Sequence, residues 1–273
     1  MALVALRTPG LVQVHVEEDL VVMGMLADRR DELGRARTQA VNRLHRLLLE
    51  LLPGGAKKYL SARQARAMIA TIEPPDLAGQ TRLRLAAELI GELEATDKKI
   101  RALDTELTGL VTARRSTLLQ LHGIGPSGAA RLLADAGDIR RFASRDRFAS
   151  WNGTSPLDAS SGNQARHRLS RAGNRRINRV LHIMAVVQLR YQTKGRAYYD
   201  TRRAGGLPPM MAMRALKRRL SNVVFARMLT DQKSREAGPG GQSGTPADSS
   251  VTGPDPGHRP FGQATSRARQ STA

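Results

Sequence analysis

The sequence has 273 residues, and its 44 lysines and arginines against 24 acidic residues give a formal net charge of +20. Such an excess predicts a polyanionic partner, DNA or RNA, because cationic side chains release counterions from phosphate backbones. A charge kept for solubility or for a membrane surface fits less well, since the arginines cluster in the middle of the chain. Without a cysteine, the chain forms no disulfide, thiolate zinc site or cysteine nucleophile.

The sequence shows no sign of membrane insertion or export. No apolar run approaches the roughly 20 residues that a membrane span needs. The first residues also lack the basic start, apolar core and cleavage site of a signal peptide. We therefore expect a cytoplasmic, nucleoid-associated protein that contacts no membrane.

Residues 1–16 differ in pattern from the rest of the chain. Ala2–Leu6 is typical of the end of a helix, and Leu11–Val16 alternates like one β-strand. A single strand cannot form a sheet by itself. We interpret 1–16 as the remnant of a truncated N-terminal domain.

Two long amphipathic helices come next, over about 17–52 and 77–118. In each, leucines recur at steps of three and four residues. We expect the acidic residues Glu17–Asp19 to cap the first helix and to favour its dipole, and not to bind metal. The turn Pro53–Gly55 ends this helix.

A short helix near 61–72, capped by Ser61, lies between the two long ones, and the segment 73–76 breaks the chain after it. The long helices therefore predict an antiparallel coiled-coil hairpin over 17–118. Its exposed stripe is buried most economically by a second copy, which gives a homo-oligomer. A helical bundle closed within one chain is the alternative.

Residues 119–232 are rich in glycine and arginine and predict a compact helical domain. The tail, 233–273, consists mostly of Gly, Pro, Ser, Thr and Arg, and we expect it to be disordered. The fold class is therefore mainly α, a helical hairpin followed by a compact helical domain.

The segment Leu121–Leu133 contains two glycines, Gly123 and Gly125, just before Pro126. The glycines permit a tight turn, and proline suits the first position of a helix. Glycine amides and a helix N-terminus together favour an anion such as a DNA phosphate. The pattern resembles a helix-hairpin-helix element with Gly123, Gly125 and Arg131 as candidate DNA contacts; an ordinary connection that binds nothing is the alternative.

The next segment, 138–151, interleaves aromatic and basic residues. Phe142, Phe148 and Trp151 are expected to anchor the core, because the chain has few aromatics. The arginines between them then face outward, either on DNA or in solvent. Arg140 and Arg141 are the candidate DNA contacts among them.

A long polar loop is expected over 152–163, and it contains the hydroxyl pair Ser160 and Ser161 followed by Gly162. Glycine removes bulk beside Ser161, so a phosphodiester can approach closely. Serine needs activation to act as a nucleophile, and His167 is a candidate base. On chemistry alone, plain loop hydroxyls and a structural histidine are the stronger interpretations.

A concentrated run of arginines comes after this loop. Arginine forks hold phosphate and neutralise charge that develops in a transition state. A later basic amphipathic helix, 213–220, either contacts DNA or is a core helix with a charged outer face. The candidate DNA contacts in the arginine run are Arg166, Arg168, Arg171, Arg175, Arg176 and Arg179.

Several of these motifs succeed one another in a specific order over about Ser116–Asp231. In that order the chain resembles the C-terminal domain of the IS110, IS116 and IS902 insertion-sequence transposases, relatives of the Piv-type DNA invertases. The segments that carry the resemblance are Gly123–Pro126, Arg141–Phe142, Trp151–Pro156, Ser160–Gly162 and Arg171–Asn178.

The resemblance implies a DNA recombinase in which a serine before a glycine attacks the DNA phosphate. That serine corresponds to Ser161, with its neighbour Ser160 as the alternative. Members of the family assemble as oligomers and use a structured guide RNA to bridge element ends and target DNA. They also carry an N-terminal RuvC-like domain whose four acidic residues, the DEDD cluster, bind magnesium.

The DEDD cluster has no counterpart in this sequence, so we expect no metal site and no cofactor in the chain itself. We expect a truncated transposase that is impaired in strand exchange when alone. A non-catalytic, oligomeric nucleic-acid-binding protein is the alternative.

Overall fold

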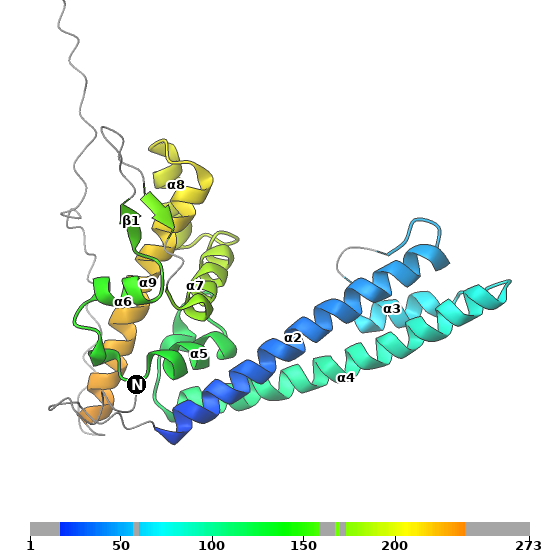
Figure 1. Cartoon of the computed structure of the whole chain (residues 1–273), viewed down its shortest axis with the longest axis horizontal. Helices are drawn as coiled ribbons and strands as arrows, with labels where there is room; N and C mark the ends of the chain where they lie inside the picture. Colours follow the sequence, from blue (N-terminus) through cyan, green and yellow to red (C-terminus); the bar gives the residue numbers. More distant parts are fainter. Residues whose placement is uncertain (1–16, 57–59, 159–166, 170–172, 238–273) are drawn as a thin grey trace, which may run out of the picture. The chain divides into compact units, whose positions relative to one another are not determined.

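The computed structural model describes residues 17–56, 60–158, 167–169 and 173–237 (Figure 1). This part of the chain is mainly α, as predicted. Two short 3-10 turns, η1 (Leu118–Gln120) and η2 (Ile139–Arg141), and two short strands, β1 (Pro156–Asp158) and β2 (His167–Leu169), accompany the helices. The helices are α2 (Glu18–Leu51), α3 (Ala62–Ile69), α4 (Leu77–Ala113), α5 (Pro126–Ala136), α6 (Arg145–Trp151), α7 (Arg175–Gln188), α8 (Lys194–Ala204) and α9 (Pro209–Glu236).

The expected strand Leu11–Val16 lies outside the described residues, as does the tail from residue 238 onward. The predicted start of that tail at 233 is too early, because α9 continues to Glu236. No helix in the described ranges is long and apolar enough to cross a membrane.

The helices α2 and α4 form the predicted antiparallel hairpin (Figure 1). Ion pairs between the two helices show the direction, since Arg30 pairs with Asp104 and Arg37 pairs with Asp97. Short helix α3 packs on α4 and begins at the predicted cap, where Ser61 and Gln64 form a capping box. Capping boxes satisfy two backbone donors that a helix start otherwise leaves free.

Helix α4 ends at Ala113, five residues earlier than the leucine spacing predicts. The chain turns at Arg115, whose φ is 53°. After the turn, the carboxylate of Asp231 on α9 accepts hydrogen bonds from Ser116 Oγ and from the Thr117 amide and hydroxyl, at 2.6 to 3.0 Å. Tertiary hydrogen bonds therefore replace the last turn of the predicted helix.

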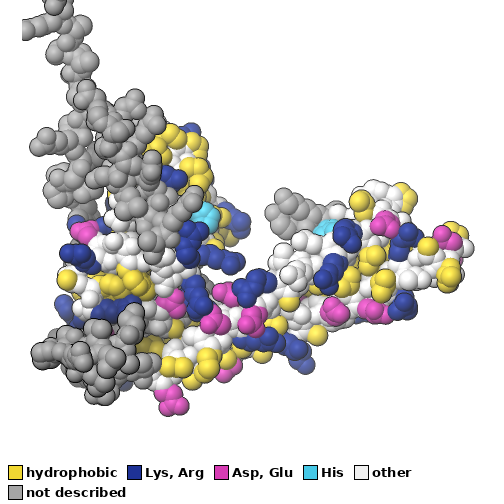
Figure 2. Space-filling model, viewed as in Figure 1, with side chains coloured by type: hydrophobic (Ala, Val, Ile, Leu, Met, Phe, Trp, Pro, Cys, Tyr) yellow, Lys and Arg dark blue, Asp and Glu magenta, His cyan; other side chains and the backbone are white. Residues whose placement is uncertain are grey.

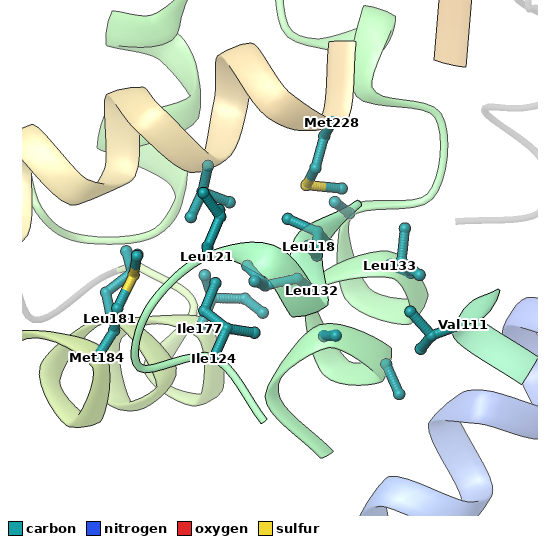
Figure 3. Close-up of a cluster of buried hydrophobic side chains, with 14 of the residues drawn as sticks. Val111, Leu118, Leu121, Ile124, Leu132, Leu133, Ile177, Leu181, Met184 and Met228 are labelled. Carbon is teal, nitrogen blue, oxygen red and sulfur yellow. The ribbon is translucent and has the colours of Figure 1, made fainter. Parts of the chain in front are cut away.

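The apolar core has two parts. One lies within the far end of the hairpin, between α2, α3 and α4, around Leu48 and Ile90. The other joins α5, α7 and α9 to the base of the hairpin, where Met23 and Val111 are buried (Figure 3). The compact helical domain was predicted to begin at residue 119, but its core also includes residues of the long helices α2 and α4.

The aromatic residues of segment 138–151 anchor this second core, as predicted. Phe148 is fully buried. Its ring centroid lies 5.2 Å from that of Phe142 and 5.6 Å from those of Trp151 and Phe225. Helix α6 is thereby fixed against α9.

Candidate nucleic-acid interface

Two separate segments, 151–155 and 173–178, meet at the root of the strand pair. The backbone amide of Asn174 donates to the carbonyl of Trp151 at 2.7 Å. Gly173 stands so close to Gly153 that a Cβ on Gly173 would lie 2.4 Å from the Gly153 nitrogen. Only glycine fits at this contact, so the backbones of two motifs of the ordered series touch directly.

The strands β1 and β2 pair antiparallel, with Pro156 opposite Leu169 and Asp158 opposite His167. The sequence predicted a polar loop over 152–163, and strands of three residues are too short to show an alternating pattern. The connection 159–166 contains Ser160, Ser161 and Arg166, which lie outside the described residues, as does Arg171. Arg168 and His167 are placed only as strand residues, so the roles of all these side chains stay predictions.

A buried asparagine organises the turn into β1. Asn152 is fully buried, and its Nδ2 donates to Ser221 Oγ of α9 at 2.8 Å. Its Oδ1 accepts from the amide and the hydroxyl of Thr154, at 3.1 and 2.6 Å. Because both ends of the amide are used, the side chain fixes the turn and ties it to α9.

A second asparagine, Asn178 of α7, holds the same turn from the other side. Its Nδ2 donates to the carbonyls of Asn152 and Gly153, both at 3.0 Å. Its Oδ1 accepts a 2.6 Å hydrogen bond from Nζ of Lys217 on α9. The side chain of Asn178 therefore bridges the turn to a lysine ammonium.

Lys217 is only 9% exposed. Burial lowers the pKa of its ammonium, and the charges of Arg175 and Arg214 lower this pKa further. The sequence placed Lys217 only within a basic helix that either contacts DNA or is a core helix with a charged outer face. One sign was available, because Lys217 interrupts an apolar stripe that continues with Leu220 and Val224 on the buried face of α9.

Helix α7 begins at Arg175, within the run of arginines noted in the sequence. Asn174 Oδ1 caps α7 by accepting from the amides of Arg176 and Ile177, at 3.0 and 3.1 Å. Arg175, Arg176 and Arg179 are exposed on the first turns of α7. On the face shown in Figure 2, basic side chains gather over α7, whereas basic and acidic side chains alternate along the hairpin.

The glycine turn before α5 has the predicted shape. Pro126 begins the helix, and Gly125 precedes it at the N-cap position. Gly123 has φ +93°, and a Cβ there would lie 2.9 Å from the carbonyl oxygen of Met184 on α7. Gly123 therefore serves the packing of this turn on α7, and DNA contact by the turn stays a prediction. The element before the turn is the single 3-10 turn η1 and not a full helix.

Arg131 is not part of a basic surface, which corrects its prediction as a DNA contact. Its side chain is 4% exposed, and Nη2 lies 2.7 Å from Asp28 Oδ1 of α2. Nη1 lies 3.6 Å from Asp135 on its own helix. A buried guanidinium needs such partners, so Arg131 ties α5 to the hairpin and has no free face for phosphate.

Arg140 and Arg141 are exposed but take part in local contacts. Arg140 pairs with Asp138 at 2.9 Å and with Glu236 at 2.8 Å. Arg141 stacks over the rings of Phe142 and Trp151, at 4.6 and 5.2 Å from the centroids. Their DNA contacts stay predictions, and binding through Arg140 requires competition with two carboxylates.

The acidic residues at the start of α2 bind an arginine. Glu17 occupies the N-cap position without a side-chain capping bond, which differs from the expected cap. Its carboxylate lies 2.7 Å from Arg114 Nη1, and Asp19 pairs with the same nitrogen. The Arg114 hydrogen bond lowers the pKa of Glu17. Across the described ranges, no group of three or more His, Asp or Glu residues is placed to hold a metal ion.

Comparison with known proteins shows that part of the chain matches a family model. Residues 115–200 match the model described as Transposase IS116/IS110/IS902 family. This range contains both segments that meet at the root of the strand pair.

Three relatives show how far the similarity extends. An "Insertion element IS900 uncharacterized 42 kDa protein" of Mycobacterium paratuberculosis is 35% identical over 54% of this chain and 39% of its own. An "Insertion element IS110 uncharacterized 43.6 kDa protein" of Streptomyces coelicolor is 32% identical over 52% of this chain and 36% of its own. A "Putative transposase y4pF/y4sB" of Sinorhizobium fredii is 30% identical over 78% and 56%. The chain thus spans between about a third and about half of the length of these relatives.

Proposed function

We propose, from the match of residues 115–200 to the IS116/IS110/IS902 transposase family and from the similarity to its relatives, that the chain is a member of this family that binds DNA and exchanges DNA strands during transposition of an insertion sequence. One observation carries the proposal. The segments 151–155 and 173–178 are locked together where the strand pair begins. The residues that connect the strands include Ser160 and Ser161, and exposed arginines of α7 come soon after them in the chain.

In the proposed reaction, the hydroxyl of Ser161 attacks a DNA phosphorus, and Ser160 is the alternative nucleophile. A bond forms between the serine oxygen and phosphorus while the bond from phosphorus to one deoxyribose oxygen breaks. The serine proton is lost to a base, and the departing oxygen gains a proton. One phosphate ester replaces another, so the step needs no oxidant and no nucleotide cofactor. Arginines hold the phosphate and offset the charge of its transition state.

The partners that belong to this proposal are element-end and target DNA, a structured guide RNA and further copies of the chain. Apolar side chains exposed on α2 and α4 support the last of these, among them Met25 at 60% and Leu85 at 38% exposure. Leu85 also borders a hollow of about 330 Å³ between the two helices, whose other lining residues are the apolar Leu47 and Leu89 and the charged Arg43, Arg46, Glu88 and Glu92. A second hairpin packed here would cover this apolar surface.

The family resemblance implies magnesium held by four acidic residues of a RuvC-like domain. The residues described by the structure do not fit such a site, because the acidic pair Glu17 and Asp19 is bound to Arg114. We therefore assign no step to a metal here.

Trapping of a covalent serine–DNA intermediate tests the proposal. The chain is incubated with element-end DNA, guide RNA and a full-length relative that carries its own serine substitution, so that any adduct must come from this chain. We expect an adduct that is lost in Ser161→Ala and kept in Ser160→Ala. An adduct that persists in Ser161→Ala but disappears in Ser160→Ala moves the nucleophile to Ser160.

The alternative function, a non-catalytic nucleic-acid-binding oligomer, predicts a different result. DNA binding then weakens with salt as for any basic protein, but no covalent product forms and Ser161→Ala changes nothing. The exposed apolar residues of the hairpin favour an oligomer in either case. If DNA binding does not weaken between low and high salt, both functions fail together.

A further inference from the structure

Three cationic side chains lie together beneath the turn into β1. Lys217 and Arg214 come from α9, and Arg175 comes from the first turn of α7. Both arginines are exposed, whereas Lys217 is 9% exposed, and both arginines act electrostatically on its ammonium. The group therefore has a buried charge at its centre and two charges at its open side.

This arrangement is unfavourable without an anion. Burying a charge costs free energy unless it is paired, and nearby like charges add to that cost. Within the described ranges, the hydrogen-bond partner of Nζ is the neutral Oδ1 of Asn178, at 2.6 Å. Neither burial nor the two arginines favours the ammonium. An ammonium has three donor hydrogens, and Asn178 uses one of them.

The position of the group links it to the strand pair. Asn178 joins Lys217 to the carbonyls of Asn152 and Gly153. An anion held by Lys217 therefore lies close to the chain that enters β1. A backbone phosphate fits best, because its oxygens accept from an ammonium and from guanidinium forks at the same time.

We propose that Lys217, Arg214 and Arg175 form a binding site for one phosphate group of the DNA backbone at the root of the β1–β2 pair. The inference rests on the proposed function and deepens it, since it names the chemical group that is held and adds two residues from α9. Lys217 positions the phosphate and the turn together. Arg214 and Arg175 bind the same phosphate from the solvent-exposed side of the site.

Lys217→Gln separates this role from a merely structural one. Glutamine retains a donor for Asn178 Oδ1 but has no charge. Because a buried cation and its repulsion disappear, the variant should unfold at the same urea concentration as the wild type or at a higher one. Its affinity for a short DNA duplex should nevertheless fall, on the order of tenfold at moderate salt. A structural lysine predicts the opposite, with lower stability and unchanged DNA binding per folded molecule.

The salt dependence of DNA binding by the full chain provides the second readout. Loss of one phosphate contact should reduce the slope of log affinity against log salt by about 0.9. Arg214→Gln should show this reduction. Because the Arg214 side chain is exposed, its substitution should not disturb folding. Arg101→Gln, which changes another exposed arginine, on α4, is the matched control and should keep the wild-type slope.

The double variant Lys217→Gln, Arg214→Gln tests whether the two residues serve one phosphate. One shared phosphate predicts a double variant with little more effect than either single change. Additive losses would mean separate phosphates and would overturn the site as proposed, as would a wild-type slope in both single variants. Wild-type binding that does not respond to salt would instead overturn the proposed function itself.

Discussion

At the scale of single residues, the root of the strand pair depends on close contacts that do not tolerate substitution of the residues involved. Gly173 lies against the backbone of Gly153, and the two asparagines Asn152 and Asn178 use both ends of their amides. Amides that are at least partly buried and have both ends hydrogen-bonded favour a single geometry over its competitors. The turn at Asn152 and Gly153, from which the chain leads to Ser160 and Ser161, therefore has a fixed conformation.

Gly173→Ala tests the close contact between Gly173 and Gly153. The added Cβ meets backbone at 2.4 Å, which cannot move aside as a flexible side chain can. We expect the free energy of unfolding to fall by about 1–3 kcal/mol, measured by urea denaturation. Gly91→Ala on α4 is the control, because its Cβ would meet nothing within 4 Å, and it should gain about 0.5–1 kcal/mol from helix propensity. Equal stability of the Gly173 variant and the wild type would contradict the close packing.

At the scale of elements, ion pairs connect the hairpin to the compact helical part. Arg131 of α5 holds Asp28 of α2, and Arg176 of α7 lies 3.3 Å from the same carboxylate. Asp135 accepts from Asn174 Nδ2 at 2.9 Å, which extends the set to the cap of α7. Arg131 and Arg176, both predicted to bind DNA, therefore link α5 and α7 to α2 through Asp28.

Arg131→Gln distinguishes this role from DNA contact. Loss of the buried guanidinium leaves Asp28 with Arg176 alone and Asp135 with Asn174 alone, and because Asp28 is half exposed we expect a loss of about 1–3 kcal/mol. The salt slope of DNA binding should not change. Arg84→Gln, which removes an exposed pair with Glu88, should cost less than about 0.5 kcal/mol. A reduced slope in the Arg131 variant would restore that residue as a phosphate contact.

At the scale of the whole molecule, charge and exposed apolar surface favour association. The net charge of +20 supports attraction to nucleic acid over a distance that salt limits. The hairpin contributes a hydrophobic interaction. Several of its apolar residues lie outside the core and are exposed to solvent within the described ranges.

Leu85→Glu tests association through the hairpin. A carboxylate on this surface cannot be buried against a second copy without a large desolvation cost. We expect the wild type to sediment as an oligomer and the variant to shift to the monomer, with helix content unchanged in circular dichroism. Ala102→Glu, at another exposed position of α4, should leave the sedimentation coefficient unaltered. A wild-type chain that is monomeric at all concentrations would exclude this interface.

The sequence by itself determined the helical hairpin, the compact helical part and the resemblance to the family, because these depend on periodicity, caps and the order of motifs along the chain. Leu33, Leu44 and Leu48 are buried as their spacing predicts, and Ser61 caps the expected short helix. The tertiary structure alone decided which charged residues are covered. Arg131 looks like other basic residues in the sequence, and Lys217 differs from them only in interrupting an apolar stripe, yet both are buried, since helices distant in the chain pack over them. Local pattern describes one face of one helix, whereas burial of a charge depends on its neighbours from other elements. For the same reason, only the folded chain brings Gly173 against Gly153 and Lys217 against Asn178.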